Sequence, residues 1–336
     1  MKGAIPLIRS GSLLLLVRWM QANGRPLEDL LRSVDLAYVL NGDPNLPIPL
    51  SQALTLLRKV SELEGPDFPA RVACGGNVSE LGLIGQIALD GGSVGSALHR
   101  VAEALPAQNS HATVSARTVP DGVIVRHAWL VRMDADTRHF TQQYFAGHIQ
   151  ALCANAGVQP PVFDRMALVP HPVHGLSHLH RWFGDGIEAS SNKTLELLVP
   201  ARVADLVLPK MSPGFRVSAA PNEYLPLSRD GKLTTVLKII MASMLVDGTP
   251  TVERLAAAGG VSVRTLQRRL GEQGASFSSL LGEVRHDLAL AALFEGERKM
   301  GEIAGSLGYG QHSSFTRAVR RWTGTSPRTL ARRLGK

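Results

Sequence analysis

The chain has 336 residues, 44% of them hydrophobic and 19% charged, which is enough apolar material for two hydrophobic cores and argues against wholesale disorder. Its two cysteines, Cys74 and Cys153, argue against a disulfide framework or a structural zinc site and fit a reducing compartment. The net charge of +8 is unevenly placed: residues 1–231 carry 20 basic and 20 acidic side chains, whereas residues 232–336 carry 16 and 8. A chain polarised in this way indicates a polyanionic partner for its last third, nucleic acid or a membrane surface.

The longest candidate for a membrane segment is the apolar stretch Leu13–Val17, which lies between Arg9 and Arg18. A membrane-spanning helix needs about 20 apolar residues, so this stretch is too short. The pattern instead predicts a buried amphipathic helix, and we expect a soluble, cytoplasmic protein.

The first 230 residues mix helical and strand patterns, which predicts an α+β domain. Helices are predicted at 12–22, 50–64, 93–105 and 137–156, with Pro106 ending the third. Residues 113–118 and 123–133 are predicted strands, joined by the turn sequence Pro120-Asp121-Gly122. Further strands are predicted at 161–169, 186–190 and 194–199.

A segment rich in Pro, Ser and Asn separates this region from the rest of the chain. It predicts a first domain over residues 1–217, a linker at 218–231 and a second domain over 232–336. Beyond the linker the strand patterns vanish, and short helices are predicted at 232–246, 251–258, 263–272, 276–295, 300–307, 312–323 and 326–334. Short helices joined by tight turns are typical of helix-turn-helix proteins.

The basic domain contains an internal repeat with a period of about 48 residues. Leu255-Ala256 matches Ile303-Ala304, and Gly260 matches Gly308. With one extra residue in the second turn, Leu266-Gln267-Arg268 then matches Phe315-Thr316-Arg317. Each copy therefore predicts a short helix, a glycine turn and a longer helix, with motifs at about 251–272 and 300–323.

Each longer helix of the repeat has an apolar face and a polar face. Val263, Leu266 and Leu270 share one face of the first, and Phe315, Val319 and Trp322 share one face of the second. The opposite faces carry Arg, Gln, Ser, Thr and His, side chains that can hydrogen-bond base edges in the major groove. The predicted base-contacting residues are Arg264, Thr265, Gln267, Arg268, His312, Ser313, Thr316 and Arg317. The predicted phosphate-contacting residues are Arg269, Arg320, Arg321, Arg328, Arg332 and Arg333.

Two other interpretations of the basic helices compete with DNA binding. A solvated basic face on an ordinary helical domain is disfavoured because the pattern occurs twice, each time after a glycine turn. A membrane surface is disfavoured because the arginines are spread over separate short helices and do not lie along one amphipathic helix.

These motifs resemble the DNA-binding domain of the AraC/XylS family of bacterial transcription regulators over residues 232–334. The resemblance rests on residues 262–270 in the first motif, and on Leu307-Gly308-Tyr309, residues 314–318, Trp322-Thr323-Gly324 and Ser326-Pro327 in the second. It implies two helix-turn-helix motifs joined by a long helix, here about 276–295, that enter successive major grooves. One position departs from the pattern: Gly259 stands where the family has a buried Leu, and this should loosen the first short helix.

The first domain resembles, more weakly, the "arabinose-binding" type domain of regulators of ornithine use and of quorum-linked virulence. The match rests on length, on Gly91–Leu98 opening a helix, and on Trp182-Phe183-Gly184 followed by Asn192 and a Leu-rich segment ending at Leu208-Pro209. The resemblance implies effector sensing, dimerisation or both. The effector and its pocket residues are not named by the sequence, and the domain name does not indicate a sugar.

Two patterns in the first domain also raise the question of chemistry. Residues 91–95 match G-x-S-x-G, in which Ser93 is either a nucleophile after a strand at 83–89 or the N-cap of the following helix. His171, His174, His178 and His180 have a spacing that could ligate zinc or nickel, but Pro170 and Pro172 favour surface or partly buried histidines.

The sequence thus predicts an α+β domain followed by an all-α domain with two helix-turn-helix motifs joined by a long linker helix. The function predicted is a sequence-specific DNA-binding transcription regulator, acting as a homodimer and, as is commoner in the resembled family, as an activator. Its expected partners are double-stranded promoter DNA, RNA polymerase and an unidentified small-molecule effector, with no cofactor, metal, membrane partner or enzymatic activity. The alternatives are a hydrolase-like first domain using Ser93, or an architectural DNA binder.

Overall fold

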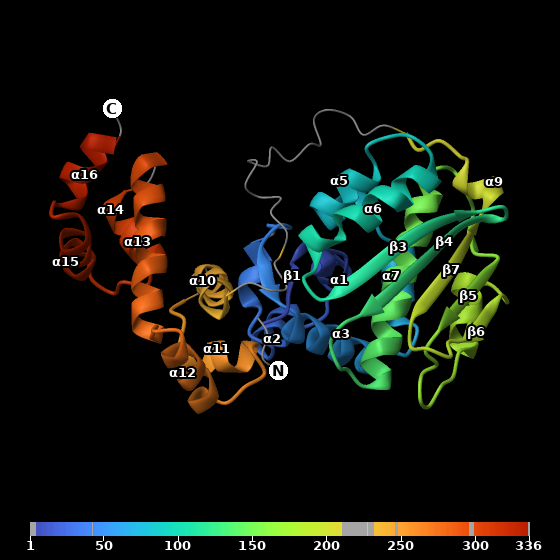
Figure 1. The fold of residues 1–336 in the computed structure, drawn as a ribbon, viewed down its shortest axis with the longest axis horizontal. Helices are drawn as coiled ribbons and strands as arrows, with labels where there is room; N and C mark the ends of the chain where they lie inside the picture. The colour runs from blue at the N-terminus through green and yellow to red at the C-terminus, as the bar shows by residue number, and fades with distance from the viewer. Residues whose placement is uncertain are drawn as a thin grey trace. The chain divides into compact units, whose positions relative to one another are not determined.

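The computed structural model describes residues 5–41, 43–209, 227, 232–245, 248–295 and 299–334 (Figure 1). The chain forms two compact units, Pro6–Arg229 and Asp230–Lys336, and the second also takes in Met1–Ile5. Apart from Leu227, the predicted linker at 218–231 lies outside the described residues. The domain boundaries therefore stay a prediction.

The first unit is built on a five-stranded sheet with the strand order β3-β4-β7-β5-β6. Its strands are β3 (Ala112–Val119), β4 (Gly122–Trp129), β5 (Arg165–Leu168), β6 (Ile187–Ala189) and β7 (Leu195–Pro200). Neighbouring strands run antiparallel except β5 and β6, which run parallel. A separate antiparallel pair joins β1 (Leu7–Arg9) to β2 (Pro47–Pro49).

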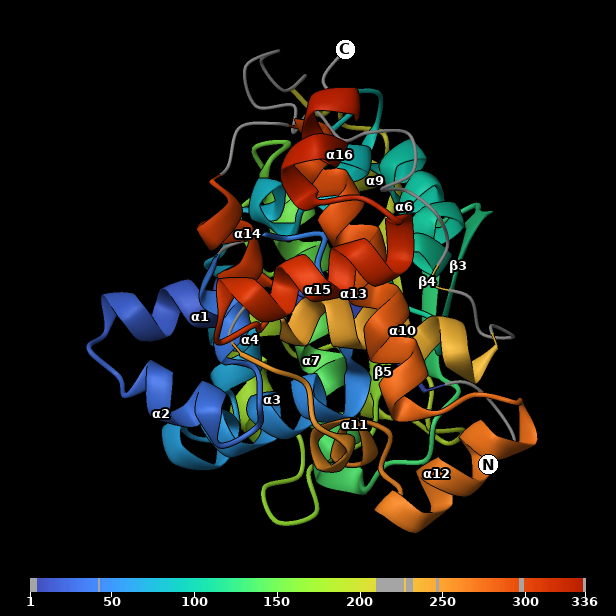
Figure 2. The same cartoon turned by 90° about the vertical axis from the view of Figure 1, so that its left-hand side faces the viewer.

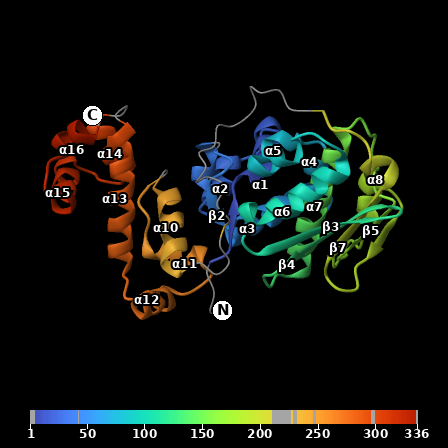
Figure 3. The ribbon, with the colours of Figure 1, turned by 45° about the horizontal axis from the view of Figure 1, so that its top comes forward.

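Helices gather on one side of this sheet, as Figures 1 and 3 show for α1, α3, α5, α6 and α7. The helices of the first unit are α1 (Gly11–Ala22), α2 (Leu27–Arg32), α3 (Leu50–Glu64), α4 (Phe68–Cys74), α5 (Leu83–Ala88), α6 (Val94–Gln108), α7 (Ala135–Ala154), α8 (His180–Phe183) and α9 (Ala201–Ala204). Three short 3-10 turns complete the unit: η1 (Ala37–Asn41), η2 (Val78–Leu81) and η3 (Ser177–Leu179). Residues such as Leu16, Leu56 and Phe68, each 0% exposed, lie in the apolar core among these helices.

Helix α7 is the central helix of the unit and contacts α3, α4 and β5. It is unusual in being buried and polar at once. Gln142, Gln143 and Gln150 are each at most 1% exposed, and all three hydrogen-bond backbone groups of other segments. These amides hold surrounding loops against the helix, because a buried backbone group needs a partner.

The predicted secondary structure of this unit is confirmed for its long elements and corrected at several points. The two strands joined at Pro120-Asp121-Gly122 form a regular antiparallel pair with eight facing residues. The prediction that Pro106 ends its helix is wrong, because α6 continues to Gln108. A proline in the last turn removes only one helical hydrogen bond, which the remaining contacts of the helix can offset. The strand considered at 83–89 is also wrong, since Leu83–Ala88 is helical.

The second unit contains only helices among its described residues. They are α10 (Leu233–Met244), α11 (Val252–Ala258), α12 (Val263–Glu272), α13 (Phe277–Glu295), α14 (Met300–Ser306), α15 (His312–Thr323) and α16 (Pro327–Leu334). The 19-residue α13 contacts α10 as well as α15 and α16, and it is seen between these groups in Figures 1 and 2. In the described residues of both units, no helix is long and apolar enough to cross a membrane.

Glycines form the turns within both helix pairs of this unit. Gly260 and Gly308 have φ values of +60° and +69°, in the left-handed region that favours glycine. At Gly259, the position that departs from the family pattern, α11 has already ended at Ala258. A Cβ at position 259 would lie 3.1 Å from the Cδ1 atom of Ile5, so the glycine leaves room for that side chain.

The glutamines of α7 give a stability prediction. Replacing Gln150 with Leu leaves the N–H of Val162 and the carbonyl of Trp182 without their present partners. We expect Gln150→Leu to lower the free energy of unfolding by about 1–3 kcal/mol in urea denaturation followed by circular dichroism. Gln52→Leu is the matched control, because Gln52 is also buried but its Oε1 atom has no hydrogen-bond partner. Equal losses for the two variants would contradict this role for Gln150.

Candidate nucleic-acid interface and a buried cavity

Helix α12 separates its apolar and polar residues as the sequence predicts. Leu266 and Leu270 are each 1% exposed, whereas Arg264, Gln267 and Arg268 are exposed. Thr265 is half-buried, and its backbone N–H donates to the Oγ atom of Ser262 at 3.2 Å. This bond confirms Ser262 as the N-cap and fixes where the helix begins.

Helix α15 has the same division of faces. Phe315 and Val319 are 0% and 1% exposed, and Trp322 is half-buried beside them. His312, Ser313 and Arg317 are exposed, and half-buried Thr316 donates its hydroxyl to the carbonyl of His312 at 3.1 Å. The predicted base-contacting residues of this helix therefore lie on or beside its solvent face.

Two of these arginines have partners within their own helices. Arg268 forms an ion pair with Glu272, and the Nη2 atom of Arg317 donates to the Oγ atom of Ser314 at 3.2 Å. Exposed contacts of this kind contribute about 0–1 kcal/mol. Exchanging them for a base or phosphate contact therefore costs little.

The six predicted phosphate-contacting arginines are distributed over three helices. Arg269 on α12 is half-buried, and the others are exposed: Arg320 and Arg321 on α15, and Arg328, Arg332 and Arg333 on α16. No acidic partner within 4.0 Å is described for the five exposed ones. Their contacts with DNA stay a prediction.

Sequence reasoning missed Arg285 on α13, which has a structural role. Its Nε atom donates to the carbonyl of Leu307 at 2.8 Å, and its Nη2 atom donates to that of Gly308 at 3.2 Å. Its guanidinium also lies 4.7 Å from the ring centroid of Tyr309. A cation at these carbonyls stabilises the C-terminal end of α14. The signal that could have found it is the helix end at Leu307, whose carbonyls need a donor.

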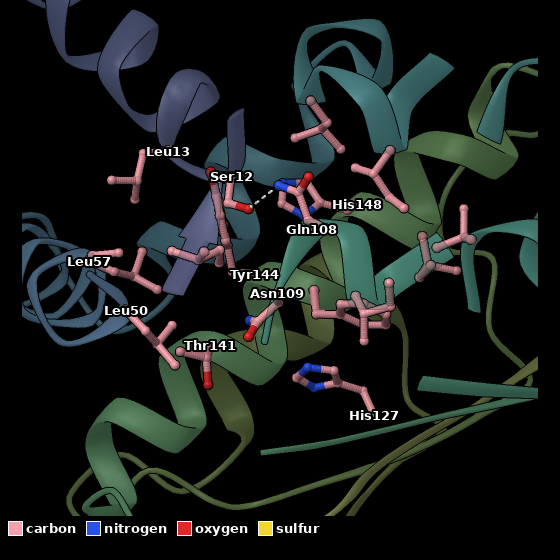
Figure 4. Close-up of a pocket in the computed structure, with 18 of the residues that line it drawn as sticks. Ser12, Leu13, Leu50, Leu57, Gln108, Asn109, His127, Thr141, Tyr144 and His148 are labelled. Atoms are coloured by element: carbon pink, nitrogen blue, oxygen red, sulfur yellow. Dashed lines mark hydrogen bonds between the residues drawn. The ribbon is translucent and has the colours of Figure 1, made fainter. Parts of the chain in front are cut away.

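A cavity of about 140 Å³ lies within the first unit and was not predicted from the sequence (Figure 4). Its wall comes from segments far apart in the chain, including α1, α3, α6, β4 and α7. Most lining residues are aliphatic, and the polar ones include Gln108, His127 and His148. Burial lowers the pKa of His127 and of His148 to about 3, so both imidazoles are neutral at physiological pH.

The predicted histidine cluster includes a fifth residue, His139, that the spacing did not reveal. The Nε2 atoms of His139 and His178 share a hydrogen bond at 2.9 Å, and His139 Nδ1 donates to the carbonyl of Val169 at 2.8 Å. His180 lies apart and pairs with Asp185 at 3.2 Å. Among the described residues, no group of three His, Cys, Asp or Glu side chains could hold a metal ion.

Ser93 acts as a helix cap in the structure. Its Oγ atom accepts a hydrogen bond from the N–H of Ser96 at 3.1 Å, at the start of α6. The segment before it is helix α5, so the strand that a nucleophile elbow requires does not precede Ser93. This geometry supports the capping interpretation.

The exposed basic faces and the paired short helices define a helix-turn-helix protein joined to an α/β domain. The comparisons with known proteins agree. A family described as "Helix-turn-helix domain" matches residues 255–333, and one described as "Arabinose-binding domain of AraC transcription regulator, N-term" matches residues 24–208, more than half of the chain. The chain belongs to the AraC family of transcription regulators.

Similarity to curated relatives is confined to part of each protein. A helix-turn-helix transcriptional regulator of Mycobacterium tuberculosis is 38% identical over 84 residues, which cover 25% of this chain and 24% of that one. The ornithine utilization regulator of Pseudomonas aeruginosa is 35% identical over 99 residues, covering 30% and 29%. The regulator VirS of M. tuberculosis is 32% identical over 107 residues, covering 32% and 31%. The chain thus matches between a quarter and a third of the length of these relatives.

One solved structure matched in the comparison is the transcriptional regulator CdpR from P. aeruginosa. It is 20% identical, and the match covers 80% of this chain and 87% of that chain with a TM-score of 0.36. A DNA-binding transcriptional dual regulator from Escherichia coli K-12 is 27% identical over 31% of this chain and 88% of that chain, with a TM-score of 0.27.

Three buried histidines predict an acid-sensitive fold. Burial lowers the pKa of His127, His139 and His148 to about 3, far below the value of about 6.5 in an unfolded chain. The unfolded state therefore binds protons first as the pH falls. We expect the stability of the first unit to be complete above about pH 6.5 and to fall below it, by about 1.4 kcal/mol per pH unit for each histidine. Thermal unfolding of the full chain from pH 7.5 to pH 4.5 measures this.

A substitution pair tests the assignment to these histidines. His127 stacks on Phe145 with ring centroids 4.4 Å apart, so His127→Phe keeps an aromatic ring in place while removing one titrating group. We expect this variant to show a shallower loss of stability with acid. The control is Phe163→Leu, which removes a buried aromatic ring but no titrating group and should leave the pH dependence of the parent unchanged. A parent whose unfolding temperature is flat over this range would refute the prediction.

Proposed function

We propose that the protein is a sequence-specific DNA-binding transcription regulator whose second unit reads the DNA. The observation that carries the proposal is the division of faces on α12 and α15, where Leu266 and Phe315 are buried and Arg264, Arg268 and Arg317 are exposed. Each helix follows a shorter one across a glycine turn. This is the arrangement in which the second helix of a helix-turn-helix motif enters the major groove.

The two helix pairs, α11–α12 and α14–α15, form two motifs joined by α13 in this proposal. A 19-residue helix is about 28 Å long, close to the roughly 34 Å that separate successive major grooves on one face of DNA. The length of α13 therefore supports simultaneous insertion of both motifs. The predicted readers are Arg264, Thr265, Gln267 and Arg268 in the first groove and His312, Ser313, Thr316 and Arg317 in the second.

The positive charge is concentrated around the second motif. Residues 232–295 carry seven basic and six acidic side chains, whereas residues 296–336 carry nine and two. In our proposal the arginines of α15 and α16 supply most of the attraction to phosphates. The first motif would add mainly base contacts, which specify sequence more than they strengthen binding.

The first unit is assigned effector sensing, dimerisation or both. Its balance of 20 basic and 20 acidic residues up to position 231 does not favour DNA. In the proposed mechanism a homodimer brings two second units to a promoter, and a bound effector alters their spacing or mobility. Bound beside a promoter, the regulator would contact RNA polymerase and act as an activator.

Arg317→Ala tests sequence reading. The cognate site is first recovered by selection from a random duplex pool with the full chain. We expect the variant to lose about 1–3 kcal/mol of binding free energy for that site, and to discriminate less between bases at one position, because a bidentate contact is removed. Fluorescence anisotropy with the cognate site and single-base variants measures both effects.

The control for Arg317 is Arg165→Ala, which removes an exposed arginine from β5 of the first unit and should leave DNA affinity unchanged. If Arg317→Ala bound the selected site as tightly as the parent, the assignment of α15 as a reading helix would be wrong. If selection recovered no preferred sequence, the protein would be better described as an architectural DNA binder than as a sequence-specific regulator.

Arg332→Ala tests phosphate attraction by α16. Because a phosphate contact is independent of base sequence, we expect weaker binding to cognate and random duplexes by the same factor. The slope of log affinity against log salt should also become shallower by about 0.9. Anisotropy titrations at several salt concentrations measure this. A loss restricted to the cognate site would instead make Arg332 a base reader.

A further inference from the structure

The cavity of the first unit has a wall that is apolar and free of formal charge. Its lining contains aliphatic residues from α1, α3 and α7, such as Leu13, Leu57 and Ile149, and among the residues that the structure describes no Asp, Glu, Lys or Arg lines it. Its volume of about 140 Å³ is close to that of an engineered apolar cavity that binds benzene. The space therefore suits a small molecule with an apolar body.

Four polar atoms of the wall lack a hydrogen-bond partner among the described residues: Gln108 Oε1, His127 Nδ1, Tyr144 Oη and His148 Nε2. They come from the end of α6, from β4 and from α7. Figure 4 labels Gln108, His127, Tyr144 and His148 among the residues of the wall. Gln108 is held in place because its Nε2 atom donates to the Oγ atom of Ser12 at 2.7 Å, so its Oε1 atom is the acceptor left over.

Other polar groups of the wall are already paired with the protein. The Nε1 atom of Trp129 donates to the Oγ1 atom of Thr141 at 2.9 Å, and Asn109 Oδ1 accepts from the N–H of His111 at 2.9 Å. Buried polar atoms nearly always have partners, and an unmade bond costs stability. Four such atoms around one cavity, beside groups whose bonds are made, point to a ligand that supplies the missing partners.

We propose that this cavity is the effector site and that it binds a small uncharged amphiphile. The ligand has an apolar body and a hydroxyl or N–H group that donates to Gln108 Oε1, with the neutral imidazoles of His148 and His127 as further partners. A carboxylate or ammonium ligand would be buried without a counter-ion, at high cost. A free sugar would press its many polar groups against a mostly aliphatic wall that cannot hydrogen-bond them, also at a cost. The inference rests on the proposed sensing role of this unit.

Matched small molecules test the charge and polarity of the ligand. The probes are 1-octanol and 2-phenylethanol, their charged counterparts octanoate and phenylacetate, and L-arabinose. Binding to the full chain is measured by isothermal titration calorimetry and by the shift in unfolding temperature. We expect at least one alcohol to bind and to raise the unfolding temperature, while both carboxylates and the sugar do neither. Tighter binding of a carboxylate or of arabinose, or no binding of either alcohol, would overturn the proposal.

Substitutions place the binding in this cavity. Gln108→Met keeps the length of the side chain but removes the acceptor, and should weaken alcohol binding by about tenfold. Gln52→Met is the matched control, since Gln52 is buried with an unpartnered Oε1 atom but does not line the cavity. Ala53→Phe should abolish binding by filling the space, because Ala53 lies in the wall on α3. Alcohol binding that Ala53→Phe and Gln108→Met both leave unchanged would place the ligand elsewhere and refute the assignment.

The proposed function and this inference fail separately. DNA binding is measured on the same samples with the selected duplex. Selective DNA binding without any alcohol binding would refute the effector-site proposal and would still support the proposed function as a regulator. Alcohol binding that depends on Gln108, without selective DNA binding, would support the ligand site and would refute the proposed function as a regulator.

Discussion

The structure of the first unit depends on the burial of a polar helix. Helix α7 lies between α3, α4 and the sheet, and its glutamine amides replace the water that buried loop backbone would otherwise need. Because Gln142, Gln143 and Gln150 each bind backbone groups of other segments, they fix the position of the helix as well as its burial. The same helix carries Thr141, Tyr144 and His148 into the cavity wall. The hydrogen bonds that hold the loops thus also position the proposed effector site.

The second unit follows a different physical rule, in which each helix buries one apolar stripe and leaves the other face to solvent. Phe315, Val319 and Leu307 pack into a small core with Ala289 and Leu293 of α13. The guanidinium of Arg285 is used within the fold, where it donates to the carbonyls of Leu307 and Gly308. Among the described residues, no acidic partner within 4.0 Å is found for Arg320 and Arg321 of α15 or for the arginines of α16, so in our proposal their charge is available to a polyanion.

The sequence predicts the second unit more accurately than the first, because each helix there has its own apolar stripe. The stripe of period 3.6 on α12 and α15 is complete within ten or twelve residues, so their bounds can be read locally and agree with the structure at Val263–Glu272 and His312–Thr323. In the first unit, β1 has only three residues and no such period, and it forms by pairing with β2 about 40 residues further along the chain. The cavity is harder still to predict, because its wall joins residues as far apart as Ile8 and Leu152.

The placement of charge links the two units to different kinds of partner. In the first unit the charges balance, with 20 basic and 20 acidic side chains up to position 231 and ion pairs such as Arg126 with Glu196 and Arg202 with Asp164, so little net field extends into solvent. Four of its buried unpartnered polar atoms, on Gln108, His127, Tyr144 and His148, lie around a space without formal charge. In the second unit, residues 296–336 carry nine basic side chains against two acidic ones. A long-range field suits a long polyanion, and a shielded apolar cavity suits a small neutral molecule, so the two partners would not compete for one site.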